Sequence, residues 1–385
     1  MDYPYPIRKE AAMRAYDENP EDYTFDLPGK LVSQEPSEAR SGQRDDARLA
    51  VVQRGTNQVE HRSFRDIIDY LEPDDLLLLN NARVVPTLLC GEDEHGRVVV
   101  VSIHSPRVDG TWHCLVAPAA VCQAGAVFSL GPDREVTGRL LTEADEGVWQ
   151  IALDPADAQA LYRVAEPIYP GYLKSAPADP DYYQTVYASR PGAVLLPSAG
   201  RHFTAELLGD LRAKGVAIAE VTLLLAARSH YFVRLLFRRR VAEGGAGDID
   251  AENRIDRSTQ TNGFDFPSAE RYEVTTETAE LINQRRARGG RIVVCGTSAL
   301  RTLETVAHED GRVLAATGFT RLRITPGHRF RACDAFLTNL HRPKSSELLL
   351  TAAFTGREPL LEVYRRELVP NGYLYYEFGD SMLII

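Results

Sequence analysis

The chain has 385 residues, of which 44% are hydrophobic, and this length and composition predict a soluble cytoplasmic enzyme with two domains. No apolar signal segment opens the sequence and no run of about 18 apolar residues occurs in it, so the sequence favours neither secretion nor a membrane span. The net charge of −10 argues against indiscriminate nucleic-acid binding, whereas residues 201–385, with 26 Lys and Arg against 23 Asp and Glu, favour one anionic partner.

The first predicted elements lie between residues 25 and 91. Residues 25–36 contain two prolines and no helical period, which indicates an extended segment. A strand is expected at 47–55. A short helix follows within 63–75, where Ser63 is the expected N-cap and the apolar residues keep i, i+3, i+4 spacing. Residues 76–91 then predict a buried strand interrupted by polar residues.

Short β-like runs separated by Gly, Pro and Asp occupy residues 88–154. Strands at this regular spacing predict a small antiparallel β-barrel inserted into the chain. Residues 155–192 are rich in Pro and Tyr and predict irregular surface structure.

The remaining chain alternates helix and strand patterns, which is typical of an α/β fold. A helix is expected at 204–215, where Thr204 precedes the apolar period and a glycine ends it. We therefore expect residues 1–87 and 155–385 to form one discontinuous α/β domain around the inserted barrel domain. The Gly-rich, charged stretch at 238–265 has no period and predicts a flexible excursion.

Five stretches, in this order, resemble the S-adenosylmethionine:tRNA ribosyltransferase-isomerase family of queuosine biosynthesis. They are "FDLP" from residue 25, "LLLLNNARVVPTLLCG" from 76, "GAVLLPSAGRHFT" from 192, "GTSALRTLE" from 296 and "TNLHRPKSSELLLTAAFTG" from 338. The resemblance implies a larger, barrel-like α/β domain built from both chain ends, with a small β-barrel inserted between them.

The resemblance also implies the reaction. The family transfers and rearranges the ribosyl group of S-adenosylmethionine onto the aminomethyl group of a 7-deazaguanine base in tRNA, and it releases adenine and methionine. This chemistry requires a base, an acid and a dry pocket, and it demands no metal. The five cysteines are scattered and odd in number, so they predict neither a zinc site nor a disulfide framework.

The stretch at 338–350 is the leading candidate for a substrate-binding loop. Pro343 fixes a turn, and Lys344, Ser345 and Ser346 stand at the start of an expected helix, whose free N–H groups suit a carboxylate or another anion. A solvated loop before a Ser-capped helix is the simpler interpretation of this stretch alone. The family match favours the binding loop.

Candidate catalytic residues are His202, His341, Lys344 and Asp380. For His202 the alternatives are a general base and a histidine hydrogen-bonded within a packed turn; for Asp380 the alternative is a simple Gly-Asp turn.

Candidate residues for binding S-adenosylmethionine or the acceptor come from the polar positions of the same motifs. They are Asn80, Asn81, Arg83, Ser198, Arg201, Thr204, Gly296, Thr297, Ser298, Arg301, Thr338, Asn339, Ser345 and Ser346. The backbone N–H groups of 296–298 suit the methionine carboxylate, although one glycine is a weak signal. Arg301 and Glu304, three residues apart, are more simply explained as a surface pair.

The sequence departs from the family pattern at several positions. Leu224 and Arg201 stand where the family has His and Leu, Asn81 stands where Asp is common, and a second family histidine is missing before Glu270. Two enzymatic functions therefore stay open: the family reaction on tRNA, and a divergent reaction of S-adenosylmethionine with another, small-molecule acceptor. A non-catalytic binder is the third interpretation, which the many retained polar residues disfavour.

Overall fold

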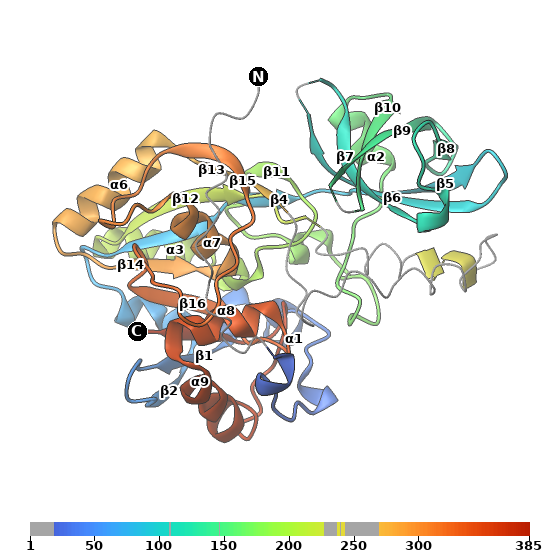
Figure 1. The fold of residues 1–385 in the computed structure, drawn as a ribbon. Helices are drawn as coiled ribbons and strands as arrows, with labels where there is room; N and C mark the ends of the chain where they lie inside the picture. Colours follow the sequence, from blue (N-terminus) through green and yellow to red (C-terminus); the bar gives the residue numbers. More distant parts are fainter. Residues whose placement is uncertain (1–18, 108, 146, 227–236, 239, 243–268) are drawn as a thin grey trace.

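The computed structural model describes residues 19–107, 109–145, 147–226, 237–238, 240–242 and 269–385. These residues form a mixed α/β part around a nine-stranded sheet and a smaller part that is a closed six-stranded barrel (Figure 1). No helix among these residues combines the length and the apolar character needed to cross a bilayer.

The nine-stranded sheet is mixed: it is parallel at its centre, and the pair of strands at each edge is antiparallel. In spatial order its strands are β15 (Ala316–Thr320), β13 (Glu270–Val274), β12 (Ala217–Leu223), β3 (Leu76–Asn80), β14 (Ile292–Cys295), β16 (Ala335–Asn339), β17 (Ser381–Ile384), β1 (Arg48–Val52) and β2 (Val59–Ser63). Strands β12, β3, β14 and β16 run parallel to one another. In the described residues the order ends at β15 and at β2, so it does not confirm the barrel-like closure expected for this part.

Helices cover both faces of this sheet, and the strand sequences explain why. Leu76 and Leu78 of β3 lie in one apolar cluster, whereas Leu77 and Leu79 lie in another, because successive side chains of a strand point to opposite faces. Every residue of β3 is buried, as is typical of a central parallel strand.

Helices α6 (Thr276–Ala287), α7 (Gly296–Val306), α8 (Ser346–Thr355) and α9 (Arg357–Val363) contribute to the first cluster, together with the π-helical turn η8 (Tyr364–Leu368). Helix α3 (Ala205–Lys214) and the 3₁₀ helix η4 (Phe64–Tyr70) contribute to the second. The helix α3 starts after Thr204, whose hydroxyl accepts a hydrogen bond from Leu207 N–H, as the sequence predicted.

Both ends of the described chain build the same sheet. The last strand, β17, pairs with β16 on one side and with β1 on the other. The C-terminal strand thereby joins the N-terminal β1–β2 hairpin to the parallel centre.

The closed barrel contains β5 (Leu88–Asp93), β6 (Val98–Pro106), β7 (Trp112–Ala117), β8 (Val127–Leu130), β9 (Val136–Asp145) and β10 (Val148–Asp154). It lies beside the nine-stranded sheet rather than over one of its faces (Figure 1). Gly91 is required where β5 meets β8, because a Cβ there would lie 2.0 Å from the carbonyl oxygen of Ser129.

The segments that connect the two parts are more regular than the sequence predicted. They contain β4 (Ala82–Val84), which pairs in parallel with β11 (Arg190–Ala193), and the helix α2 (Ala158–Val164). The remaining short elements are α1 (Ser37–Ser41) and the 3₁₀ turns η1 (Pro20–Asp22), η2 (Gly29–Leu31), η3 (Arg44–Asp46), η5 (Ala119–Val121), η6 (Pro180–Tyr183) and η7 (Ser198–His202). The excursion expected at 238–265 lies outside the described residues, apart from 238 and 240–242.

Candidate active site

The sequence motifs converge at the carboxyl ends of the parallel strands. Asn80 ends β3, Gly296 follows β14, and Thr338 and Asn339 end β16. Parallel strands place their carboxyl ends at one edge of a sheet, and this edge is where open α/β sheets bind their ligands. With Leu223, which ends β12, four segments that are far apart in the sequence therefore meet at one edge.

Asn80 ties three of these segments together. Its side-chain amide donates to Leu223 O and to Ser298 Oγ, both at 3.1 Å, and its Oδ1 accepts from the N–H groups of Leu223 (3.0 Å) and Ala82 (3.2 Å). Asn80 is 1% exposed, so each bond satisfies a group that water does not reach. The hydrogen bonds of Asn80 thus fix the distances from β3 to β12 and to the start of α7.

The neighbouring Asn81 is also fully engaged. It donates to Glu220 Oε2 at 2.9 Å and accepts from Thr222 Oγ1 at 2.7 Å. Both partners belong to β12, so Asn81 binds one strand edge. Arg83, in contrast, is exposed on β4.

The N-terminus of α7 is open. Gly296 begins the helix with φ at +88°, a conformation that residues with a Cβ rarely adopt, and no side chain caps the helix. The first N–H groups of a helix have no acceptor within the helix, so those of Thr297 and Ser298 are available donors at the positive end of the helix dipole.

Arg301, one turn further along α7, is held rigidly. Its Nη1 forms an ion pair with Glu270 of β13, and its Nε donates to Leu322 O at 2.9 Å. Arg301 is 6% exposed, and its Nη2 has no hydrogen-bond partner among the described residues.

The simpler interpretation of Arg301 and Glu304 as a surface pair is wrong. Glu304 is 2% exposed, and its carboxylate accepts from the N–H groups of Arg331 and Ala332 and lies 3.3 Å from His328. Both residues point into the protein with separate partners, because α7 is buried along most of its circumference.

The loop before α8 is closed by local hydrogen bonds. Ser345 caps the helix by accepting from Leu348 N–H at 3.1 Å, and Thr338 Oγ1 lies 2.8 Å from His341 Nε2. Lys344 has a positive φ of 61°, and its ammonium group lies 2.7 Å from Glu21 Oε1. The Lys344 side chain is therefore directed to the N-terminal segment.

A cavity of about 30 Å³ lies between the starts of α7 and α8. Its lining residues are Leu225, Thr297, Ser298, Arg301, Leu322, Arg323, Ile324, Ser346, Glu347 and Leu350. Four of the expected binding residues line it: Thr297, Ser298, Arg301 and Ser346. The sequence prediction missed Leu225, Glu347, Leu350 and the stretch 322–324, which carries no motif of its own.

His202 lies elsewhere, within the apolar cluster on the α3 side. It is fully buried, its ring packs against Phe64 with 5.1 Å between ring centroids, and its Nδ1 lies 3.3 Å from Arg44 O. Burial, reinforced by the charge of Arg201, lowers the pKa of His202 to about 3. The imidazole is therefore neutral at pH 7.

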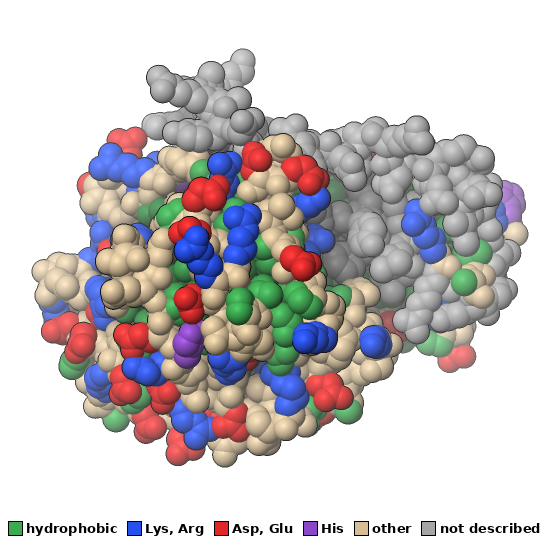
Figure 2. Space-filling view, turned by 90° about the horizontal axis from the view of Figure 1, so that it is seen from below, with side chains coloured by type: hydrophobic (Ala, Val, Ile, Leu, Met, Phe, Trp, Pro, Cys, Tyr) green, Lys and Arg blue, Asp and Glu red, His purple; other side chains and the backbone are tan. Residues whose placement is uncertain are grey.

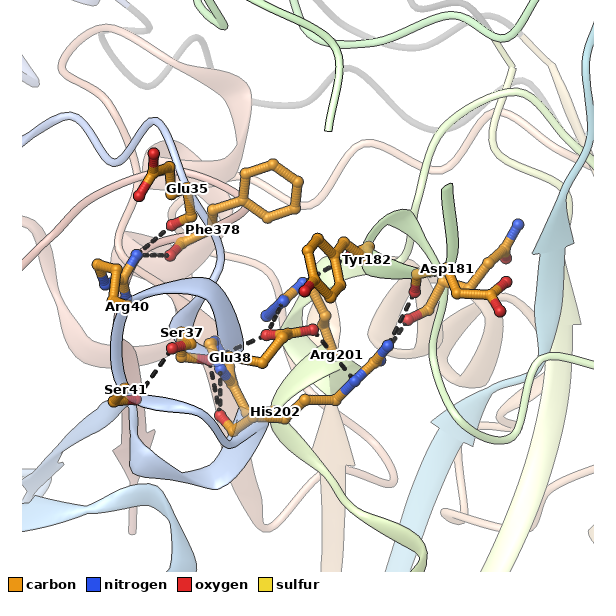
Figure 3. Close-up of polar contacts among 12 residues, drawn as sticks. Glu35, Ser37, Glu38, Arg40, Ser41, Asp181, Tyr182, Arg201, His202 and Phe378 are labelled. Atoms are coloured by element: carbon orange, nitrogen blue, oxygen red, sulfur yellow. Dashed lines mark hydrogen bonds and ion pairs between the residues drawn. The ribbon is translucent and has the colours of Figure 1, made fainter. Parts of the chain in front are cut away.

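Arg201 is the centre of a buried polar cluster beside His202 (Figure 3). It forms an ion pair with Glu38 of α1 and donates to Tyr182 O at 2.9 Å, while Arg44 approaches the other oxygen of Glu38 at 3.2 Å. Burial lowers the pKa of Arg201 to about 10, so the guanidinium remains charged at neutral pH. The cluster attaches the N-terminal segment to η7.

The remaining expected residues have structural contacts. Ser198 donates to Asn339 Oδ1 at 3.0 Å, which links η7 to the end of β16. Asp380 accepts from the N–H groups of Arg48 (3.0 Å) and Leu374 (2.8 Å), and burial raises the pKa of its carboxyl group. No group of three His, Cys, Asp or Glu side chains among the described residues has the arrangement of a metal site.

Comparisons with known proteins identify relatives along nearly the whole chain. A family model described as "Queuosine biosynthesis protein" matches residues 20–235 and 258–384. The S-adenosylmethionine:tRNA ribosyltransferase-isomerase of Moorella thermoacetica is 37% identical over 369 residues, covering 95% of this chain and 99% of the relative. The enzyme of the same name from Desulforamulus reducens is 35% identical over 367 residues, covering 94% and 99%.

A solved structure is similar as well. The crystal structure of S-adenosylmethionine tRNA ribosyltransferase from Thermotoga maritima matches with a TM-score of 0.52 and 31% identity, covering 94% of this chain and 100% of that one.

Proposed function

This chain belongs to the queuosine biosynthesis protein family, and we propose on that basis that it is an S-adenosylmethionine:tRNA ribosyltransferase-isomerase. The observation that carries the proposal is the full-length similarity to enzymes of that name. The family matches extend across every segment that reaches the carboxyl edge of the parallel strands, and not over one domain alone.

The proposed reaction joins the ribosyl group to the acceptor through one new carbon–nitrogen bond and breaks the two bonds that hold adenine and methionine to it. The acceptor nitrogen and the carbon beside the sulfonium each lose a proton; one of these protons leaves with adenine and the other goes to a base. The aminomethyl nitrogen of a 7-deazaguanine base in tRNA takes the ribosyl group, whose rearrangement gives an epoxycyclopentane. The glycosidic bond and the bond to sulfur break, which releases adenine and methionine. The protein must therefore bind a sulfonium substrate, neutralise a leaving base and accept protons.

We place the S-adenosylmethionine site at the carboxyl edge of β12, β3, β14 and β16. Asn80 has a positioning role, since it fixes the distance between these strands and α7. We also assign a positioning role to His202, because it is buried in the cluster on the α3 side and does not line the cavity. His341 is the better candidate for proton transfer, since it follows β16 at this edge and is half-buried.

The acceptor is proposed to be tRNA, in the cytoplasm. On the face shown in Figure 2, Lys and Arg side chains lie among Asp and Glu side chains, and the described residues form no continuous basic surface there. We therefore expect tRNA to bind through shape and a few local contacts.

We also propose the domain organisation on which this site depends. The barrel of residues 88–154 is a domain inserted into a discontinuous α/β domain of residues 1–87 and 155–385. An apolar cluster that joins Leu88, Val100 and Leu115 to Val194 and Leu223 supports a fixed connection between the two.

The test is to incubate the purified protein with S-adenosylmethionine, with and without tRNA that carries the aminomethyl-deazaguanine base. Mass spectrometry would follow adenine, methionine and the modified nucleoside. Release of adenine only with this tRNA, together with the epoxycyclopentane nucleoside, is the expected result. Release without tRNA would instead favour another acceptor, and no release with either would count against the activity.

A further inference from the structure

We infer that the cavity between α7 and α8 binds the α-amino-acid end of S-adenosylmethionine, with the carboxylate on Arg301 and the start of α7 and the ammonium group facing Glu347. This inference rests on the proposed function, since it names the part of the substrate that the cavity takes. It assigns one orientation to the substrate at the carboxyl edge of the sheet.

The first support is the incomplete bonding of Arg301. A guanidinium group has five N–H donors, and the two partners of Arg301 engage its Nη1 and Nε. The Nη2 is buried and has no partner among the described residues, although a buried donor without a partner is costly. A carboxylate in the cavity would accept from this nitrogen.

The ion pair with Glu270 fixes the position of the Arg301 guanidinium, so that its remaining nitrogen is already placed to bind an anion. Glu270 is 1% exposed and also accepts from Ala226 N–H at 3.2 Å, so its position is fixed from both sides. The pair holds the guanidinium in place before a ligand arrives, and a fixed donor loses little freedom when it binds.

The second support is the start of α7, one turn from Arg301. Thr297 and Ser298 line the same cavity, and no side chain caps this 11-residue helix. Free N–H groups and the positive end of the dipole both favour a negative group at this point. The Arg301 guanidinium and the N-terminus of α7 therefore both present positive potential to the same cavity.

The opposite wall of the cavity indicates an amino acid rather than a simple anion. A volume of about 30 Å³ takes the carboxylate end of such a ligand, but not a nucleoside. Glu347, on the α8 side, provides a negative charge for an ammonium group. Leu225, Leu322 and Leu350 provide apolar contacts for the methylene groups of a methionyl chain.

The affinities for two nucleosides test whether the protein binds the amino-acid end of the substrate. S-adenosylhomocysteine carries the amino-acid end, whereas 5′-methylthioadenosine lacks it and keeps the nucleoside. Calorimetric titration of the full-length protein should give an affinity about tenfold or more higher for S-adenosylhomocysteine, because a hydrogen bond to a charged group contributes roughly this factor.

Arg301→Lys and Glu347→Gln test the two charges. We expect Arg301→Lys to remove most of the preference for S-adenosylhomocysteine and to leave the affinity for methylthioadenosine within about twofold, since one ammonium cannot replace the planar fork. Glu347→Gln, at a half-buried position, should reduce the same preference about threefold to tenfold. Arg291→Lys is the matched control, because Arg291 pairs with Asp75 at the opposite end of β14.

Equal affinities of the wild-type protein for both nucleosides would overturn the inference. So would an equal loss of affinity for both nucleosides in both variants, which indicates a general structural effect. Failure of both nucleosides to bind, combined with no adenine release in the presence of tRNA, would overturn the proposed function itself. Adenine release with tRNA but no preference for S-adenosylhomocysteine would overturn the inference alone.

Discussion

Replacing His202 by Gln should make the stability of this protein less sensitive to acid. His202 is fully buried, and its pKa is lowered to about 3, first by burial and then by the charge of Arg201. In the unfolded chain the imidazole has a pKa near 6.5. Between about pH 3 and pH 6.5, the unfolded chain therefore binds a proton that the folded chain excludes.

This difference determines the sign and the size of the effect. Stability rises with pH wherever the unfolded state binds more protons, so His202 lowers the free energy of unfolding as the pH falls through this window. From pH 7 to pH 5 the difference amounts to about 2 kcal/mol, since the unfolded imidazole is almost fully protonated at pH 5 and the folded one is neutral. Glutamine does not titrate and contributes no such loss.

The assay is urea unfolding at pH 7 and pH 5, followed by circular dichroism, for the wild type and His202→Gln. From pH 7 to pH 5, the free energy of unfolding should fall by about 2 kcal/mol more in the wild type than in the variant. This difference does not depend on how stable the variant is at pH 7. His95→Gln is the control for the replacement of a histidine by glutamine, because the His95 side chain is 66% exposed.

An equal loss in the wild type and in His202→Gln would refute the reasoning. It would mean that the imidazole accepts a proton inside the fold, and the neutral, positioning role proposed for His202 would then fail. Asp380, whose pKa burial raises, titrates with the opposite sign, but it is present in both proteins and cancels in the comparison.

Three further substitutions test the fold around the site. Asn80→Asp should cost about 2–4 kcal/mol at pH 7, because the hydrogen bond donated to Leu223 O becomes a contact between a buried carboxylate and a carbonyl oxygen. Urea unfolding at pH 5 should show a smaller loss of stability, since the protonated acid can donate to that oxygen. Gly91→Ala should lower the melting temperature by several degrees in calorimetry because its Cβ would meet Ser129 O, and an unchanged value would contradict the barrel packing. Thr204→Ala should cost about 1 kcal/mol in urea unfolding, whereas Thr204→Ser should retain most of the cap at Leu207 N–H.

The local pattern of the sequence determined most elements of this fold. Apolar spacing, the Thr204 cap and the alternation of strands are set by neighbouring residues, so the start of α3 and the strand runs of the barrel could be predicted. The motif residues of β3, α7 and β16 were also identifiable from their order along the chain.

Only the tertiary structure decided which of these residues meet. Arg301 and Glu304 have the spacing of a surface pair, yet both are buried, because the partners of Arg301 come from β13 and the segment after β15. His202 and Arg301 both belong to sequence motifs. His202, however, is buried in the cluster on the α3 side, whereas Arg301 lines the cavity. Sequence spacing governs contacts within one helix or strand, whereas burial and charge pairing between distant segments depend on how strands are ordered in the sheet.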